Sequence, residues 1–153
     1  MKKLIFLLTI FFFAGNSCQK KYDAEADKKA LVKLTAEDWD ANFLSGNYEA
    51  NVDFYTEDAV RIDDVKEYRG KEAMRALFKT NSEGYTVLRH ENKVEDTWLS
   101  GDRATVRGSF SGSFIHKESG DTLNIKGAWV DVCERQADGS WKMLFTLASG
   151  LKD

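Results

Sequence analysis

The second half of the chain consists of long extended segments separated by short turn sequences, and this pattern limits the possible folds more than any other. The segments span residues 85–99, 103–116, 122–135 and 140–149. Between them lie Ser-Gly-Asp at 100–102, Ser-Gly-Asp at 119–121 and Ala-Asp-Gly at 137–139, which are typical turn sequences. No proline occurs in the chain, so every residue of these segments has a backbone N–H that can take part in strand pairing. The pattern predicts a meander of long antiparallel strands.

Helical patterns precede these strands. Val32, Ala36, Trp39 and Phe43 recur at intervals of four, three and four, which predicts one apolar stripe on a helix that starts near residue 30. Ser45-Gly46 ends this helix. We expect a short second helix capped by Asn47, a strand near 59–62 and, after the turn at Arg69-Gly70, a third helix. Helices followed by strands predict an α+β domain, with the helices packed on one face of a curved, mostly antiparallel sheet.

The first seventeen residues have the pattern of a secretory signal peptide. Met1-Lys2-Lys3 is basic, and residues 4–14 are apolar except for Thr9. This apolar run is too short to span a bilayer, which takes about 20 residues. The small residues Gly15 and Ser17 favour cleavage just before Cys18, so we predict a signal peptide at 1–17.

The residues around the expected cleavage site resemble a bacterial lipobox. In Gly15-Asn16-Ser17-Cys18, small residues precede a cysteine, although Gly15 stands where a leucine is usual. The resemblance implies that Cys18 carries lipid, with a free thiol as the alternative. We therefore expect lipid attachment and a tether at 18–29 and the folded domain at 30–153. An aspartate directly after the lipid-bearing cysteine keeps some lipoproteins at the inner membrane, and Gln19 is not an aspartate. The expected location is therefore the bacterial cell envelope, with the lipid anchor in the outer membrane.

Composition and spacing exclude several classes of function. The net charge is −3 and charged residues of both signs make up 31% of the chain, so no basic surface is expected to bind nucleic acid. His90 and His116 are isolated on strands, so we expect surface positions for both and no metal site. Cys133 is expected to be a buried thiol. Gly108 and Gly112 lie within a strand, where they favour sheet curvature, and no nucleotide cofactor is indicated.

Two stretches of sequence resemble a known family. Ser45-Gly46-Asn47-Tyr48 through residues 54–60, together with residues 68–73, resembles the helix-strand-turn-helix signature of SnoaL-like and nuclear-transport-factor-2-like domains, which include ketosteroid isomerase. The segment 129–132 followed by 138–143 resembles the last hairpin of a subgroup of that superfamily. The resemblance implies a cone-shaped fold with a pocket between the sheet and the helices. It also implies a small apolar ligand and, in many members, a homodimer formed through the outer sheet face.

The aromatic residues are the candidate ligand-binding side chains in such a pocket. The alternative for each of them is a place in the hydrophobic core. The candidates are Trp39, Phe43, Tyr55, Phe78, Phe110 and Trp129.

Two carboxyl groups are the candidate catalytic residues. By resemblance to the isomerase, Asp63 matches the aspartate that abstracts a proton, and Asp131 matches the protonated aspartate that stabilises an oxyanion. Strand alternation places Trp129, Asp131 and Cys133 on one face. The alternatives are a solvated carboxylate for Asp63 and, for Asp131, an ion pair with Arg107 or Arg135.

These observations leave three hypotheses for function. The first is a lipid-anchored domain that binds a small apolar or amphipathic molecule, with no catalysis assigned. The second is an acid–base enzyme of isomerase type that uses Asp63 and Asp131; here Trp39 in place of the isomerase's tyrosine argues against steroid isomerisation. The third is a homodimeric interaction module.

Overall fold

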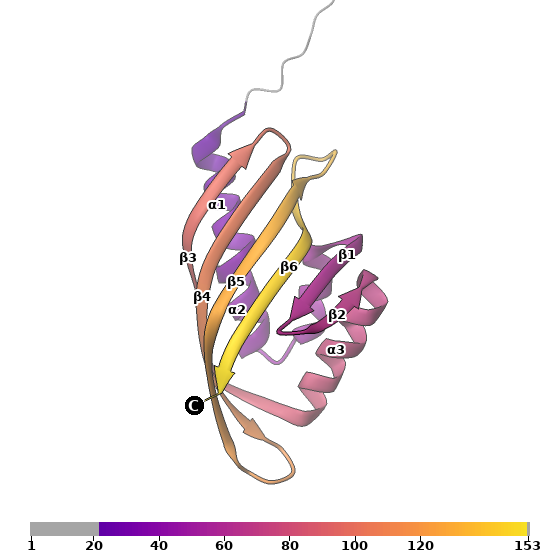
Figure 1. Cartoon of the computed structure of the whole chain (residues 1–153), viewed down its shortest axis with the longest axis vertical. Coiled ribbons are helices and arrows are strands. Elements are labelled where there is room, and N and C mark those ends of the chain that lie inside the picture. Colours follow the sequence, from indigo (N-terminus) through magenta and orange to yellow (C-terminus); the bar gives the residue numbers. More distant parts are fainter. Residues whose placement is uncertain (1–21, 153) are drawn as a thin grey trace, which may run out of the picture.

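Three helices lie against one face of a curved, six-stranded sheet in the computed structural model, which describes residues 22–152 (Figure 1). The helical elements are α1 (Ala24–Val32), the π-helical turn η1 (Lys33–Glu37), α2 (Asp38–Leu44), the 3-10 helix η2 (Tyr48–Phe54) and α3 (Gly70–Gly84). The strands are β1 (Tyr55–Asp63), β2 (Lys66–Arg69), β3 (Tyr85–Ser100), β4 (Arg103–His116), β5 (Thr122–Arg135) and β6 (Trp141–Lys152). The α+β class is therefore confirmed.

The sheet has the order β2-β1-β6-β5-β4-β3, in which β1 pairs with β6 in parallel and all other neighbours are antiparallel. The four long strands form the predicted meander, and β4 and β5 have the expected bounds. Strand β2 was not expected. It pairs Lys66 with Asp63 across a tight turn in which Asp64 adopts a positive φ of 54°.

The first helix begins at Ala24, earlier than the expected start near residue 30. The Asp23 side chain caps it by accepting hydrogen bonds from the backbone amides of Glu25 and Ala26. One turn later, Asp27 pairs with Arg135 at the end of β5, with both side chains largely buried. Residues 24–29 are mostly polar, so their sequence did not indicate a helix, although the ion pair fixes this helix to the sheet. The part of the expected tether that the structure describes from Ala24 onward is therefore helical.

A π-helical turn shifts the buried face of this long helix. The extra residue in η1 rotates the face, so that Leu31 is fully buried while Val32, expected on the apolar stripe, is half-buried. After the turn, Ala36 and Trp39 are buried as expected. Among the described residues no helix is long and apolar enough to cross a membrane. The predicted signal peptide and the proposed lipid site at Cys18 lie outside the described residues and stay predictions.

Glycines on the concave face let aromatic rings lie flat against the sheet. A Cβ atom on Gly108 would come within 2.6 Å of the Trp129 ring, and one on Gly127 would come within 2.6 Å of the Phe110 ring. Each glycine therefore provides the space that the ring on the neighbouring strand occupies. The rings form a wall instead of filling the interior, which leaves room for a cavity.

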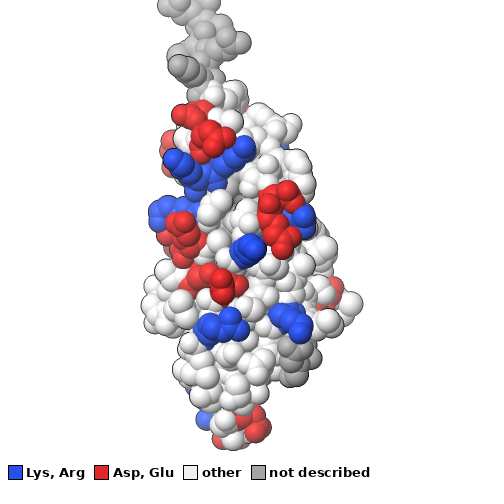
Figure 2. Space-filling model, turned by 90° about the vertical axis from the view of Figure 1, so that its left-hand side faces the viewer, with Lys and Arg blue, Asp and Glu red and all other residues white. Residues whose placement is uncertain are grey.

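The outer face of the sheet carries apolar side chains that none of the helices within residues 22–152 covers. Leu147 pairs with Val130 on one side and Ile62 on the other, and Phe145 pairs with Val132 and Val60 in the same way. Leu147 is 40% exposed and the others are half-buried. The charges on the face shown in Figure 2 are of mixed sign, with uncharged areas between them. The expectation of a homodimer formed through the outer face stays a prediction.

Candidate functional site

A cavity of about 310 Å³ lies between the concave face of the sheet and the helices. This volume is at the lower end of the range for pockets that hold small organic molecules. The structure brings together all eight candidate residues of the sequence analysis along its wall: Trp39, Phe43, Tyr55, Asp63, Phe78, Phe110, Trp129 and Asp131. Aromatic rings make up much of the wall, and two hydrogen-bonded clusters of polar side chains also lie along it.

The first polar cluster is a chain of hydrogen bonds that starts at Asp131. This residue lies on β5 with its side chain on the concave face, as strand alternation predicts, and it is 4% exposed. Its Oδ1 lies 2.6 Å from Thr146 Oγ1 on β6, and that hydroxyl oxygen lies 3.3 Å from Tyr55 Oη. The carboxyl group is thus connected through Thr146 to the phenol of Tyr55.

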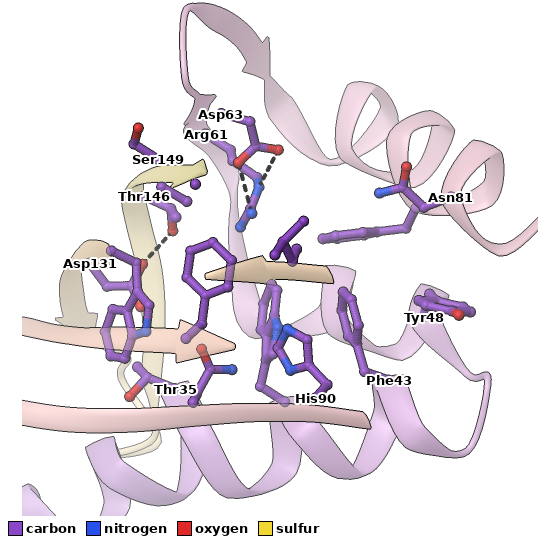
Figure 3. A pocket seen from close by; sticks show the side chains of 18 of the residues that line it. Thr35, Phe43, Tyr48, Arg61, Asp63, Asn81, His90, Asp131, Thr146 and Ser149 are labelled. Carbon is purple, nitrogen blue, oxygen red and sulfur yellow. Dashed lines mark hydrogen bonds and ion pairs between the residues drawn. The ribbon is translucent and has the colours of Figure 1, made fainter. Parts of the chain in front are cut away.

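Arg61 continues this chain to the second carboxyl group. Its Nη1 donates a hydrogen bond of 2.9 Å to Tyr55 Oη, while Nε and Nη2 contact the two oxygens of Asp63 at 3.1 and 2.8 Å. The guanidinium group also lies over the ring of Trp39, 5.6 Å from its centroid. Figure 3 shows Arg61 between Asp63 and the part of the cavity where Thr146 and Asp131 meet. Asp63 is therefore an ion-pair partner of Arg61, and its side chain remains 31% exposed.

The alternative hypothesis for Asp131, an ion pair with Arg107 or Arg135, is wrong. Arg107 pairs with Glu95 and Asp96, and Arg135 pairs with Asp27.

Burial raises the pKa of Asp131 to about 7, although the hydrogen bond from Thr146 and the charge of Arg61 act in the opposite direction. A carboxyl group with this pKa exchanges its proton near neutral pH.

The protonation state of Asp131 decides which group donates in each hydrogen bond between Asp131, Thr146 and Tyr55. When Asp131 is ionised, it accepts the single hydroxyl proton of Thr146. When Asp131 is neutral, it can donate to Thr146, whose own proton then goes to Tyr55. Tyr55 Oη would then accept from both Thr146 and Arg61, which leaves the phenol proton free for a group in the cavity. Burial also raises the pKa of Tyr55, so this proton is retained.

The second polar cluster joins His90 on β3 to Asp40 on α2. His90 Nδ1 lies 2.7 Å from Asp40 Oδ1, and the backbone and side-chain amides of Asn92 each donate a hydrogen bond of 2.7 Å to the same carboxylate. The two Asn92 donors show that Asp40 acts as a hydrogen-bond acceptor. A neutral His90 must then donate to Asp40, so its proton lies on Nδ1. Nε2 is then a free acceptor.

His90 faces the cavity, and its side chain is only 7% exposed. Its ring lies beside the labelled ring of Phe43 in Figure 3, with the two centroids 4.6 Å apart. The centroid of Phe110 lies 6.4 Å away. No hydrogen bond to Nε2 is found among the described residues. The expectation that His90 is a strand surface residue is therefore wrong.

A scan against family models matches residues 26–143 to the SnoaL-like domain. This match covers more than half of the chain. The chain belongs to the SnoaL-like family. The fold resemblance noted in the sequence is therefore confirmed at the family level, while a comparison with curated proteins gave no match.

Solved structures share the fold of this SnoaL-like domain. A ketosteroid isomerase-like protein from Erwinia carotovora atroseptica aligns with a TM-score of 0.71 at 18% identity, over 85% of this chain and 98% of the other. A putative scytalone dehydratase from Novosphingobium aromaticivorans gives 0.71 at 13% identity, over 84% and 87%. A nuclear transport factor 2-like protein from Salmonella enterica gives 0.72 at 12% identity, over 84% and 93%. At these identities the likeness shows the fold alone.

Sequence reasoning missed three polar residues that line the SnoaL-like cavity, His90, Arg61 and Thr146, and also Asp40, the hydrogen-bond partner of His90. A register shift between Val87 and Arg89 in the pairing of β3 with β4 breaks the alternation that would otherwise point His90 outward. Asp40 then becomes its partner from α2. Arg61 and Thr146 could have been found, because Arg61 precedes Asp63 by two residues on β1 and Thr146 lies opposite Asp131 in the β5–β6 pairing.

Among residues 22–152 no cluster of side chains has the composition of a metal site. Cys133 is fully buried, as expected, and burial raises the pKa of its thiol, so it is not a reactive thiolate.

Proposed function

We propose that this SnoaL-like domain binds a small, mostly apolar molecule in its cone, with the polar part of that molecule beside Asp131. The single observation that carries the proposal is the cavity of about 310 Å³, walled by aromatic rings and containing two polar clusters. A core that only needed to be stable would fill this space, because unfilled volume costs stability. The glycines beneath Trp129 and Phe110 keep the rings against the sheet and so keep the space open.

Mass spectrometry under native conditions tests the proposal on the mature domain purified from its own cells. The expected result is a bound small molecule that is lost in Ala148→Trp. Ala148 lines the cavity opposite Trp129, so the larger side chain fills the site. The matched control is Val65→Trp, since Val65 is 97% exposed and does not line the cavity. Retention of the molecule by Ala148→Trp, or a wild-type domain with none bound, contradicts the proposal.

A second function, acid–base catalysis, is favoured by one observation. The same cavity contains a carboxyl group whose burial raises its pKa to about 7 and a histidine whose Nε2 is free. An acid and a base on one bound molecule are the groups needed to move a proton at carbon next to a carbonyl group. In this scheme His90 removes the proton and Asp131 donates a hydrogen bond to the oxygen that gains charge. Asp63, the base expected from the sequence, is instead the ion-pair partner of Arg61, which donates a hydrogen bond to its Oδ2.

A further inference from the structure

The cavity opens at one end of the domain. Its partly exposed wall residues include Asn81 near the end of α3, Leu123 at the start of β5 and Ser149 near the end of β6. Figure 1 shows these ends of α3, β5 and β6 in the lower part of the view. In the upper part, fully buried core side chains such as Leu31 and Val106 do not line the cavity. The mouth of the cavity therefore lies at the lower end.

The chain leads toward Cys18 from the opposite end of the domain. Helix α1 begins there at Ala24, at the top of Figure 1. This end, termed the anchor end, comprises residues 22–27, 98–103 and 134–141. Along β5, the stretch from Leu123 to Arg135 covers about 40 Å at the usual rise of a strand. The anchor end and the mouth are therefore separated by most of the length of the sheet.

A buried ion pair holds α1 in place at the anchor end. Arg135 donates hydrogen bonds of 2.7 and 2.5 Å to the two carboxylate oxygens of Asp27, and Trp141 Nε1 donates a third at 3.3 Å. Nε of Arg135 also lies 3.2 Å from Asp102 in the turn between β3 and β4. Because these contacts join the helix to three strands, α1 cannot swing away from the sheet without breaking them.

The stretch between the predicted lipid site and this fixed helix is short. Only residues 19–22 lie between Cys18 and the helix cap Asp23. Fully extended, the chain from Cys18 to Asp23 reaches less than about 20 Å. The tether expected from the sequence, residues 18–29, would have reached about 40 Å. A lipid on Cys18 therefore keeps the anchor end close to the bilayer.

Exposed aromatic side chains at the anchor end are an independent indication of a bilayer. Among the large apolar side chains that are exposed within residues 22–152, two are aromatic, Tyr22 and Trp98. Tyr22 is 52% exposed and Trp98 is 53% exposed, and both belong to the anchor end. Tyrosine and tryptophan are the side chains that are enriched where a bilayer meets water. Their position matches that of the predicted lipid.

We infer that the anchor end lies against a lipid bilayer and that the mouth of the cavity is directed away from it, toward water. Arg103 pairs with Glu134 and Arg135 pairs with Asp27, so this contact does not depend on anionic headgroups. The ligand then enters the cavity from the aqueous phase and not from the bilayer beneath the domain. This last consequence rests on the proposed function, whereas the orientation does not.

Spin labels on the lipidated protein in vesicles test the orientation. The vesicles consist of neutral phospholipid with a small share of a nickel-chelating lipid, which speeds the relaxation of labels near the headgroups. The label is attached at Ala137→Cys in the anchor end or at Glu118→Cys in the turn at the mouth end, both exposed positions. Cys133 is fully buried and stays unlabelled. We expect severalfold faster relaxation at residue 137 than at residue 118, at low and at high salt.

Three further variants, each carrying the label at residue 137, show what sets the orientation. A flexible Gly-Ser insertion between Lys20 and Lys21 lengthens the tether outside the described fold and should slow the relaxation. Trp98→Ser should also slow it, because it removes an aromatic ring from the contact. The matched control is Leu151→Ser, which changes a side chain that is 71% exposed near the mouth end and should have no effect.

The outcomes separate this inference from the proposed function. Relaxation that is faster at residue 118 than at residue 137, or equal at both, overturns the orientation. A Trp98→Ser variant that behaves like Leu151→Ser overturns the aromatic contact, and a protein that does not float with the vesicles overturns the lipid attachment. A domain without a bound small molecule in native mass spectrometry contradicts the proposed function and leaves the orientation intact.

Discussion

Replacing Asp131 by asparagine should make the protein progressively more stable than the wild type as the pH rises from 4 to 8. The free energy of unfolding of the variant, relative to the wild type, should increase by about 4 kcal/mol over this range. The reason is the burial of the carboxyl group, which raises its pKa in the folded protein to about 7 from a model value of 3.8. Asparagine keeps the shape of the side chain and has no proton to lose.

The sign follows from which state binds the proton. Between pH 4 and 7 the folded protein holds a proton on Asp131 and the unfolded chain does not. Raising the pH through this window therefore costs the wild type about 1.4 kcal/mol of stability per pH unit, and Asp131→Asn escapes this cost. Below pH 4 both states of the wild type are protonated, and only differences that do not depend on pH remain.

Denaturant unfolding at several pH values measures this effect, with Asp27→Asn as the matched control. The hydrogen bond from Arg135 lowers the pKa of Asp27, so the wild type gains stability from Asp27 as the pH rises. The control variant should therefore become less stable relative to the wild type with rising pH. A pH slope of zero for Asp131→Asn, or a slope of the same sign as that of the control, would show that Asp131 is not held as a neutral acid.

If the cavity is an acid–base site, the wild-type domain should accelerate the exchange of deuterium from D2O into 2-tetralone. His90 Nε2 takes a proton from the carbon beside the carbonyl, the C–H electron pair forms a C=C bond, and the π pair of the carbonyl moves to the oxygen. The imidazolium exchanges its proton with D2O and returns a deuteron to the carbon, which restores the ketone and the neutral His90. A positioned base or acid contributes a factor of about 10²–10⁴, so His90→Gln and Asp131→Asn should each lower the exchange rate by about that factor. Proton NMR of the ketone measures the rate.

Two further variants make the exchange experiment specific. His116→Gln changes a histidine at the end of β4 that does not line the cavity, so the rate should be unchanged. Asp63→Asn tests the base predicted from the sequence, and circular dichroism reports whether the fold survives the loss of the partner of Arg61. A rate lost in Asp63→Asn and kept in His90→Gln would assign the base to Asp63. A wild-type rate equal to that of buffer leaves binding without catalysis.

The long strands could be predicted from sequence because their turns are local signals. Gly101, Gly120 and Gly139 each have a positive φ in the structure, and the turn sequences around them delimit β4 and β5 at the expected residues. The start of the first helix was placed too late because the fixing interaction joins distant residues. Asp27 contacts Arg135 and Trp141, and neither partner is visible from the local pattern.

The cavity could be predicted only in part, for a similar reason. Asp131 follows from alternation on an unbroken strand segment, which places it on one face with Trp129 and Cys133. His90 depends on a register shift in β3 that periodicity cannot reveal, and on Asp40 from a helix fifty positions earlier in the chain.

The four tryptophans of this chain provide the most direct test that the cavity is the ligand site. Their indole N–H resonances can be followed by NMR while 2-tetralone is added to the 15N-labelled domain. Trp39 and Trp129 line the cavity, whereas Trp98 is 53% exposed and Trp141 binds Asp27, and neither of these lines the cavity. The account predicts that the resonances of Trp129 and Trp39 shift while those of Trp98 and Trp141 stay in place. A shift of Trp98 with Trp39 and Trp129 unmoved, or no shift at saturating ketone, would contradict it.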